Sequence, residues 1–187
     1  MDDLSAGGFR AASEYFVAAV EAVPPARYAD RWSEEWTTLD LIGHGNRANV
    51  LAVTYFEHPA ALAGPDYVLP ENIAARGRQA VLDLGDDPVA SVRAASLRAI
   101  ALAQAAPDDA MVGTPFGEQR LADYLRSRTA ELVLHGLDLG TDVQPPSIAL
   151  EQCGTYLLGV AQWKGHGLDV IRALTGRGSL PEGFNVF

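Results

Sequence analysis

Residues 118–139 read EQRLADYLRSRTAELVLHGLDL. Apolar side chains recur along this stretch at the spacing of one helix face, at Leu121, Leu125, Leu132 and Leu139. Glu131 and His135 are four residues apart, so a helix places their side chains on one face, about 6 Å from each other. The stretch therefore predicts an amphipathic helix that carries a carboxylate beside an imidazole.

Proline, glycine and aspartate residues divide the rest of the chain into further stretches with helical periodicity. We expect these helices at residues 4–23, 37–56, 71–84, 88–106 and 147–175, and loops at residues 59–70 and 107–117. Gly165 and Gly167 are expected to split or bend the last helix. The pattern predicts an all-α protein, a four-helix bundle with extra short helices, in a single domain over residues 1–187.

Composition and charge exclude several classes of protein. Hydrophobic residues make up 48% of the chain and charged residues 20%, as in globular proteins. The net charge of −10 disfavours nucleic-acid partners and anionic membrane surfaces. No apolar run is long enough to span a membrane, Met1–Ser5 lacks the start of a signal peptide, and Cys153 is the single cysteine. We expect a soluble, cytoplasmic protein without an intrachain disulfide.

A metal site is the chemistry that these residues indicate. Glu131 and His135 can close on one cation, and a third ligand must then come from another helix. His44 is the leading candidate, because it lies within the apolar face of the helix expected at 37–56. Two histidines and one carboxylate leave coordination positions open, which is typical of a catalytic metal. The set suits zinc, and also iron(II) or nickel; the sequence does not choose among them.

The same residues have simpler interpretations. Glu131 and His135 could form a surface ion pair, and His44 could be a hydrogen-bonded core histidine. Asp138 could orient a metal-bound group or cap its helix, and Arg128 could hold Glu131 or an anionic substrate. Tyr55 and Tyr124 could line a pocket or lie at the edge of the core.

Two motifs carry a family resemblance. Residues 36–44 (WTTLDLIGH) and 128–139 (RTAELVLHGLDL) resemble the mycothiol-dependent maleylpyruvate isomerase family, of the DinB/YfiT-like four-helix bundles, and residues 172–177 and 180–186 are also similar. The resemblance implies one divalent metal bound by His44, Glu131 and His135. It also implies a low-molecular-weight thiol such as mycothiol, which becomes a thiolate on the metal and attacks an electrophilic carbon. The expected partners are a small-molecule thiol and an electrophilic substrate.

Two departures from the family are evident. Its isomerases carry a second, C-terminal domain, whereas this chain ends at Phe187, so we expect a substrate other than maleylpyruvate. Gly45 follows His44 where a bulkier apolar residue is expected, and it should loosen the helix there.

Three functional hypotheses follow. The first is a metal-dependent thiol transferase or isomerase. The second is a non-catalytic metal- or ligand-binding bundle with a stress or regulatory role. The third is a metal-free helical interaction protein. A homodimer is compatible with each of them.

Overall fold

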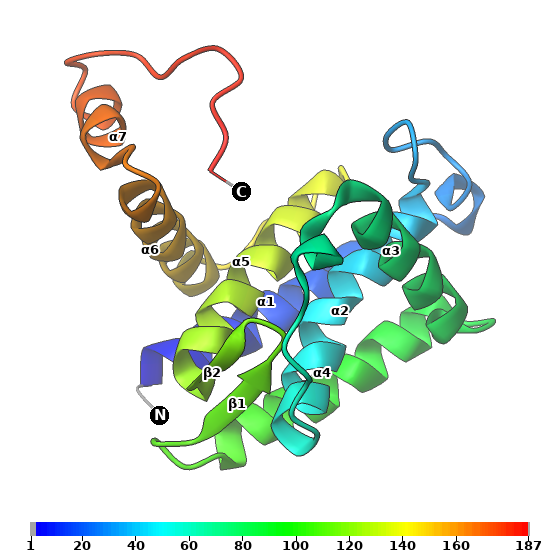
Figure 1. The fold of residues 1–187 in the computed structure, drawn as a ribbon. Helices are drawn as coiled ribbons and strands as arrows, with labels where there is room; N and C mark the ends of the chain where they lie inside the picture. Colours follow the sequence, from blue (N-terminus) through cyan, green and yellow to red (C-terminus); the bar gives the residue numbers. More distant parts are fainter. Residues whose placement is uncertain (1–2, 187) are drawn as a thin grey trace.

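Seven α-helices and one short β-hairpin make up the computed structural model, which describes residues 3–186 (Figure 1). The helices are α1 (Asp3–Glu21), α2 (Thr38–Glu57), α3 (Pro70–Leu84), α4 (Pro88–Ala105), α5 (Leu121–Asp138), α6 (Ser147–Trp163) and α7 (Gly167–Leu174). The strands are β1 (Met111–Thr114) and β2 (Gly117–Arg120), and 3₁₀ turns cover Pro25–Arg27 and Pro65–Val68. The predicted all-α class is confirmed. The prediction that the chain lacks a signal peptide rests partly on Met1 and Asp2, which lie outside the described residues.

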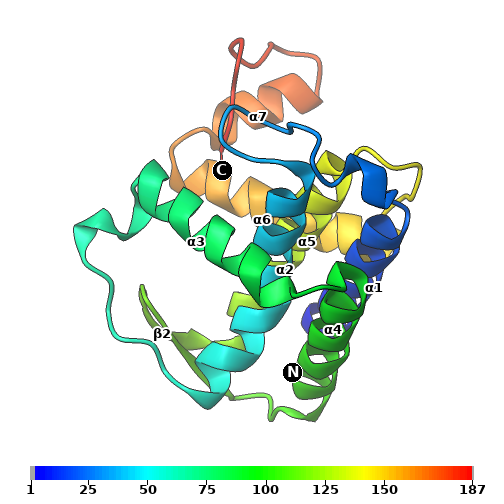
Figure 2. The same cartoon turned by 90° about the vertical axis from the view of Figure 1, so that its right-hand side faces the viewer.

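Four helices form the bundle. Helix α1 packs against α4 and α5, and α2 packs against the same two helices (Figure 2). The largest fully buried side chains between them include Phe9, Phe16, Leu41, Leu125 and Leu132. Each such side chain contributes about 1.5–3 kcal/mol when it leaves water. Outside this bundle, α6 covers α1 and α5, and α3 lies on α2. None of the helices in the described part of the chain is long and apolar enough to cross a membrane.

Helix α2 starts with a capping box. The Thr37 hydroxyl accepts a hydrogen bond from the Asp40 backbone N–H, and the Asp40 carboxylate accepts one from the Thr37 backbone N–H. These bonds satisfy two donors that a helix start otherwise leaves unpaired. The cap fixes where the helix begins, and hence which face of α2 carries His44.

The hairpin corrects the sequence prediction at residues 107–120. We expected a loop to Gly117 and a helix from Glu118, but Glu118–Arg120 pair with Met111–Gly113 in an antiparallel ladder. Val112 and Thr114 of β1 are buried. The burial of these side chains and the ladder's hydrogen bonds outweigh the helix propensity of Glu118–Arg120, so α5 begins at Leu121.

The last helical region is split as predicted. Gly165 adopts a φ of 86°, which ends α6 and turns the chain into α7. Helix α7 has no buried residue and continues away from the bundle (Figure 1). The functional site therefore has to be sought on α1–α6 and the hairpin.

Candidate metal centre and its pocket

The fold brings together the three side chains that the sequence nominated. His44 comes from α2, whereas Glu131 and His135 lie one turn apart on α5. One donor atom from each residue lies within 4.8 Å of the others. Glu131 Oε2 is 3.1 Å from His135 Nε2, and the two histidine rings meet edge to face with centroids 4.9 Å apart. Such a set is within reach of one ion, whose nitrogen and oxygen ligands lie at about 2.0–2.2 Å.

His44 has the environment of a neutral ligand. Burial and the neighbouring charge of His135 lower the pKa of His44 to about 4. Its Nδ1 is buried and has no hydrogen-bond partner among the described residues. A buried nitrogen without a partner is costly in a core histidine, so the simpler interpretation of His44 as a hydrogen-bonded core residue does not fit. Trp36, which lies just before α2 in the chain, packs against the His44 ring with centroids 4.5 Å apart.

Glu131 and His135 of α5 stabilise each other's charged forms. Burial alone would raise the pKa of Glu131, but the hydrogen bond with His135 and the charge of Arg128 lower it to about 2. Burial alone would lower the pKa of His135, but its hydrogen bonds with Asp138 and Glu131 raise it to about 9. His135 Nδ1 donates to Asp138 Oδ2 at 3.3 Å. A metal-binding histidine usually donates the N–H of its other ring nitrogen to a carboxylate or carbonyl, which fixes the orientation of the ring.

Both histidines are followed by glycines that pack against α1. A Cβ on Gly45 would lie 2.6 Å from the Phe16 ring and 3.1 Å from His135 Cβ. A Cβ on Gly136 would lie 2.3 Å from the Tyr15 ring. Helix α2 continues unbroken through Gly45, and the missing side chain leaves room for Phe16 of α1 and His135 of α5. This contact brings His44 and His135 together.

The three candidate ligands, His44, Glu131 and His135, open onto a pocket of about 640 Å³. Helices α2, α3 and α5 form most of its wall, and the tip of the hairpin closes one side with Pro115 and Phe116. Tyr55 and Tyr124 line it, as one of the two alternatives predicted. Burial raises the pKa of both phenols, so their hydroxyls stay protonated and can donate hydrogen bonds.

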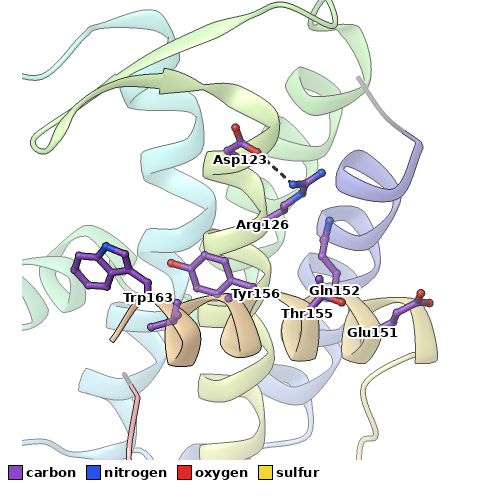
Figure 3. A pocket seen from close by; sticks show the side chains of 9 residues that line it. Asp123, Arg126, Glu151, Gln152, Thr155, Tyr156 and Trp163 are labelled. Atoms are coloured by element: carbon purple, nitrogen blue, oxygen red, sulfur yellow. Dashed lines mark hydrogen bonds and ion pairs between the residues drawn. The ribbon is translucent and has the colours of Figure 1, made fainter. Parts of the chain in front are cut away.

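A second cavity of about 500 Å³ adjoins the first between α5 and α6 (Figure 3). Tyr156 and Asp123 line both cavities, and Asp123 forms an ion pair with Arg126 at 3.3 Å. Trp163 lies at the far end and is 84% exposed. The chain thus offers two neighbouring spaces, of which only the first includes the three candidate ligands.

The remaining histidines lie elsewhere. His58 is exposed at the end of α2, and His166 lies against Phe184 near α7. Sequence reasoning missed Arg47 and Arg76, which both line the pocket. Arg47 is three residues after His44, so helical spacing alone could have identified it.

Comparison with known proteins identifies the family. Residues 9–140 match the family model of the mycothiol maleylpyruvate isomerase N-terminal domain, over more than two thirds of the chain. The chain belongs to this family. The matched region of the isomerase N-terminal domain includes all three candidate ligands, and the predicted resemblance is confirmed.

Solved structures agree with the family assignment. The crystal structure of the mycothiol-dependent maleylpyruvate isomerase superposes with a TM-score of 0.61 at 19% identity, covering 82% of this chain and 68% of that chain. A mutant of that isomerase gives a TM-score of 0.57 at 21% identity, with the same coverage. At such identities the likeness shows a common fold. No curated protein matches the chain.

Proposed function

We propose that this chain is a metal-dependent isomerase or transferase that uses a low-molecular-weight thiol similar to mycothiol. His44, Glu131 and His135 hold one divalent ion, and an electrophilic small molecule enters the adjoining pocket. The observation that carries the proposal is that the three donors open onto a pocket of about 640 Å³. Within residues 3–186 no fourth His, Cys, Asp or Glu joins the trio, which favours an open catalytic site over a closed structural one.

The donor set suits the metal that we propose. Two imidazoles and one carboxylate suit zinc, and iron(II) or nickel also fit. A divalent ion bound there would supply a Lewis acid that lowers the pKa of a coordinated thiol. His44 is already neutral, and Glu131 is already a carboxylate, as metal ligation requires.

The surrounding residues have distinct roles in this proposal. Asp138 accepts the Nδ1 proton of His135 and so keeps Nε2 directed toward Glu131 and the site. The protonated hydroxyls of Tyr55 and Tyr124 can donate hydrogen bonds to a carbonyl oxygen of the electrophile, where negative charge develops during thiolate addition. An isomerase would release the thiol after rotation about the former double bond, and a transferase would retain it on the product.

The first test is metal content. Purified wild-type protein should contain about one zinc, iron or nickel ion per chain by elemental mass spectrometry, and His44→Ala should lose it while far-UV circular dichroism stays unchanged. His58→Ala is the matched control, because His58 is exposed outside the pocket.

The outcomes separate the three hypotheses. Metal that depends on His44, together with mycothiol-dependent conversion of an electrophile in a screen, supports the enzyme. Metal without such conversion supports a non-catalytic binding bundle. Wild-type protein that stays metal-free after dialysis against zinc overturns the proposed site and favours a metal-free role.

A further inference from the structure

Helix α7 presents an apolar face that the described chain does not cover. The helix has eight residues, none of them is buried, and it packs against the end of α6 rather than into the bundle (Figure 1). Its large apolar side chains, Leu168, Ile171 and Leu174, follow at steps of three residues, so they lie on one face, and each is more than half exposed. A helix this short is only marginally stable in water, because helical stability comes mostly from packing of the apolar face. Helix α7 therefore requires a partner surface.

The apolar surface continues onto the end of α6. Trp163 is the last residue of α6 and is 84% exposed at the end of the α5–α6 cavity (Figure 3). A hollow of about 500 Å³ lies in the angle between α6 and α7, lined by Leu158, Leu168 and Ile171 among others. We call residues 158–174 the arm. The arm thus carries both an exposed indole and an apolar hollow that is large enough for one.

Scattered surface leucines are the simpler explanation of exposed apolar side chains. It accounts for Leu82 of α3 and Leu97 of α4, because single exposed leucines are normal on protein surfaces. It does not account for the arm, where five large apolar side chains are exposed within 17 residues: Leu158, Trp163, Leu168, Ile171 and Leu174. Contiguous apolar patches mark contacts with other molecules, and tryptophan is enriched at the centres of protein interfaces. The arm therefore has the composition of an interface.

The charge distribution favours a second copy of the chain as the partner. The net charge of the chain is −10, so contacts between two copies generally bring negative surfaces together. The arm contains Lys164, Arg172 and one acidic residue, Asp169, so its net charge is +1 and the rest of the chain carries −11. Two copies can meet at their arms without this repulsion, whereas a basic partner would be attracted to the acidic remainder of the chain.

We infer that two copies of the chain form a two-fold symmetric dimer through their arms, in which Trp163 of each copy fills the hollow between α6 and α7 of the other. A two-fold contact uses the same patch on both subunits, so the inserted side chain and the hollow that receives it must lie on one patch, as they do on the arm. The inference goes beyond the proposed function. Because Trp163 also lines the α5–α6 cavity, the dimer places the second copy beside that cavity.

The test measures molecular mass by sedimentation velocity from low to high micromolar concentration of the whole chain. Wild-type protein should shift from monomer to dimer across this range. Trp163→Ala should weaken the dimer by roughly 30-fold or more, the effect of removing an aromatic side chain from the centre of an interface. Trp163→Phe should retain part of the affinity. Leu168→Glu places a charge in the hollow of both copies and should abolish the dimer.

Leu97→Glu is the matched control, because it adds the same charge at an exposed position of α4, which packs against α1 and α2. It should leave the dimer dissociation constant unchanged. All of these positions are exposed, so far-UV circular dichroism should stay as in wild type. Wild-type protein that remains monomeric at high micromolar concentration overturns the inference, as does a dimer that Leu168→Glu does not weaken. A dimer that is sensitive to Leu168→Glu but not to Trp163→Ala overturns the place given to Trp163.

Failure of the inference can be distinguished from failure of the proposed function, because the arm does not include the candidate metal ligands. Trp163→Ala and Leu168→Glu should retain the metal content of wild type, and His44→Ala should retain the dimer. A dimer that depends on the arm, in a protein that takes up no metal, sustains the interface and overturns the metal-dependent reaction. Metal that depends on His44, in a protein that stays monomeric, has the opposite meaning.

Discussion

At the scale of single residues, the proposed centre combines one imidazole that is already neutral with one that holds a proton. Burial lowers the pKa of His44 to about 4, whereas hydrogen bonds with Asp138 and Glu131 raise the pKa of His135 to about 9 against the effect of burial. A metal ion can bind His135 Nε2 only after a proton has left that ring. The metal-free site is therefore an ion pair between Glu131 and His135 that the metal must replace.

We expect zinc binding to release about one proton near neutral pH. The affinity should rise by about tenfold per pH unit between pH 6 and 8, because a higher pH removes the proton that competes at His135. His44 is neutral across this pH range and therefore does not add to the pH dependence of the zinc affinity. Calorimetry in two buffers of different ionisation enthalpy measures the released proton, and competition with a chromophoric chelator measures the affinity. An affinity that does not change with pH contradicts the exchange of a proton for metal at His135.

At the scale of elements, close packing of the helices depends on glycines at the contact positions. Gly45 lies on α2 beneath the fully buried Phe16 of α1, and its missing Cβ also leaves room for His135 of α5. A larger residue would push these helices apart or force Phe16 out of its rotamer. The packing that stabilises the bundle thus also sets the spacing of the candidate ligands.

Gly45→Ala should lower the free energy of unfolding by about 1–3 kcal/mol, as overpacked core positions do. Urea denaturation followed by circular dichroism measures the change. Gly154→Ala on α6 is the matched control: nothing lies within 4 Å of its added Cβ, so it should stabilise the protein by about 0.5–1 kcal/mol. A neutral or stabilising Gly45→Ala would show that the contact with Phe16 relaxes without cost.

At the scale of the whole molecule, a buried polar cluster joins three helices of the bundle. The Ser13 hydroxyl of α1 donates to Asn49 Oδ1 of α2 at 2.7 Å, and lies 2.7 Å from the Ser96 hydroxyl of α4. All three residues are buried. Buried polar groups of this kind favour one arrangement of helices over others, because any other register leaves them unpaired.

Ser13→Ala should destabilise the bundle by about 1–3 kcal/mol, because it leaves buried groups of Asn49 and Ser96 without a partner. Chemical denaturation measures the difference, and Ser179→Ala in the exposed tail should have no effect. Equal stability of Ser13→Ala and wild type would mean that water or a rearranged side chain replaces the lost bonds.

Several features could be predicted from the sequence because they depend on neighbours along the chain. Helical periodicity predicted the helices, including one that starts near residue 37, and Gly165 predicted the break before α7. The four-residue spacing of Glu131 and His135 also predicted their contact, since spacing within one helix fixes which side chains meet.

Tertiary structure alone decided what depends on contacts between distant segments. The hairpin at residues 111–120 forms because its strands pair with each other and bury Val112, an outcome that local propensity does not encode. The role of Gly45 appears only when Phe16 of another helix lies against it. Likewise, the convergence of Arg47, Arg76 and Arg128 on one cavity follows from the packing of three helices, because burial and charge at a site are properties of the assembled fold.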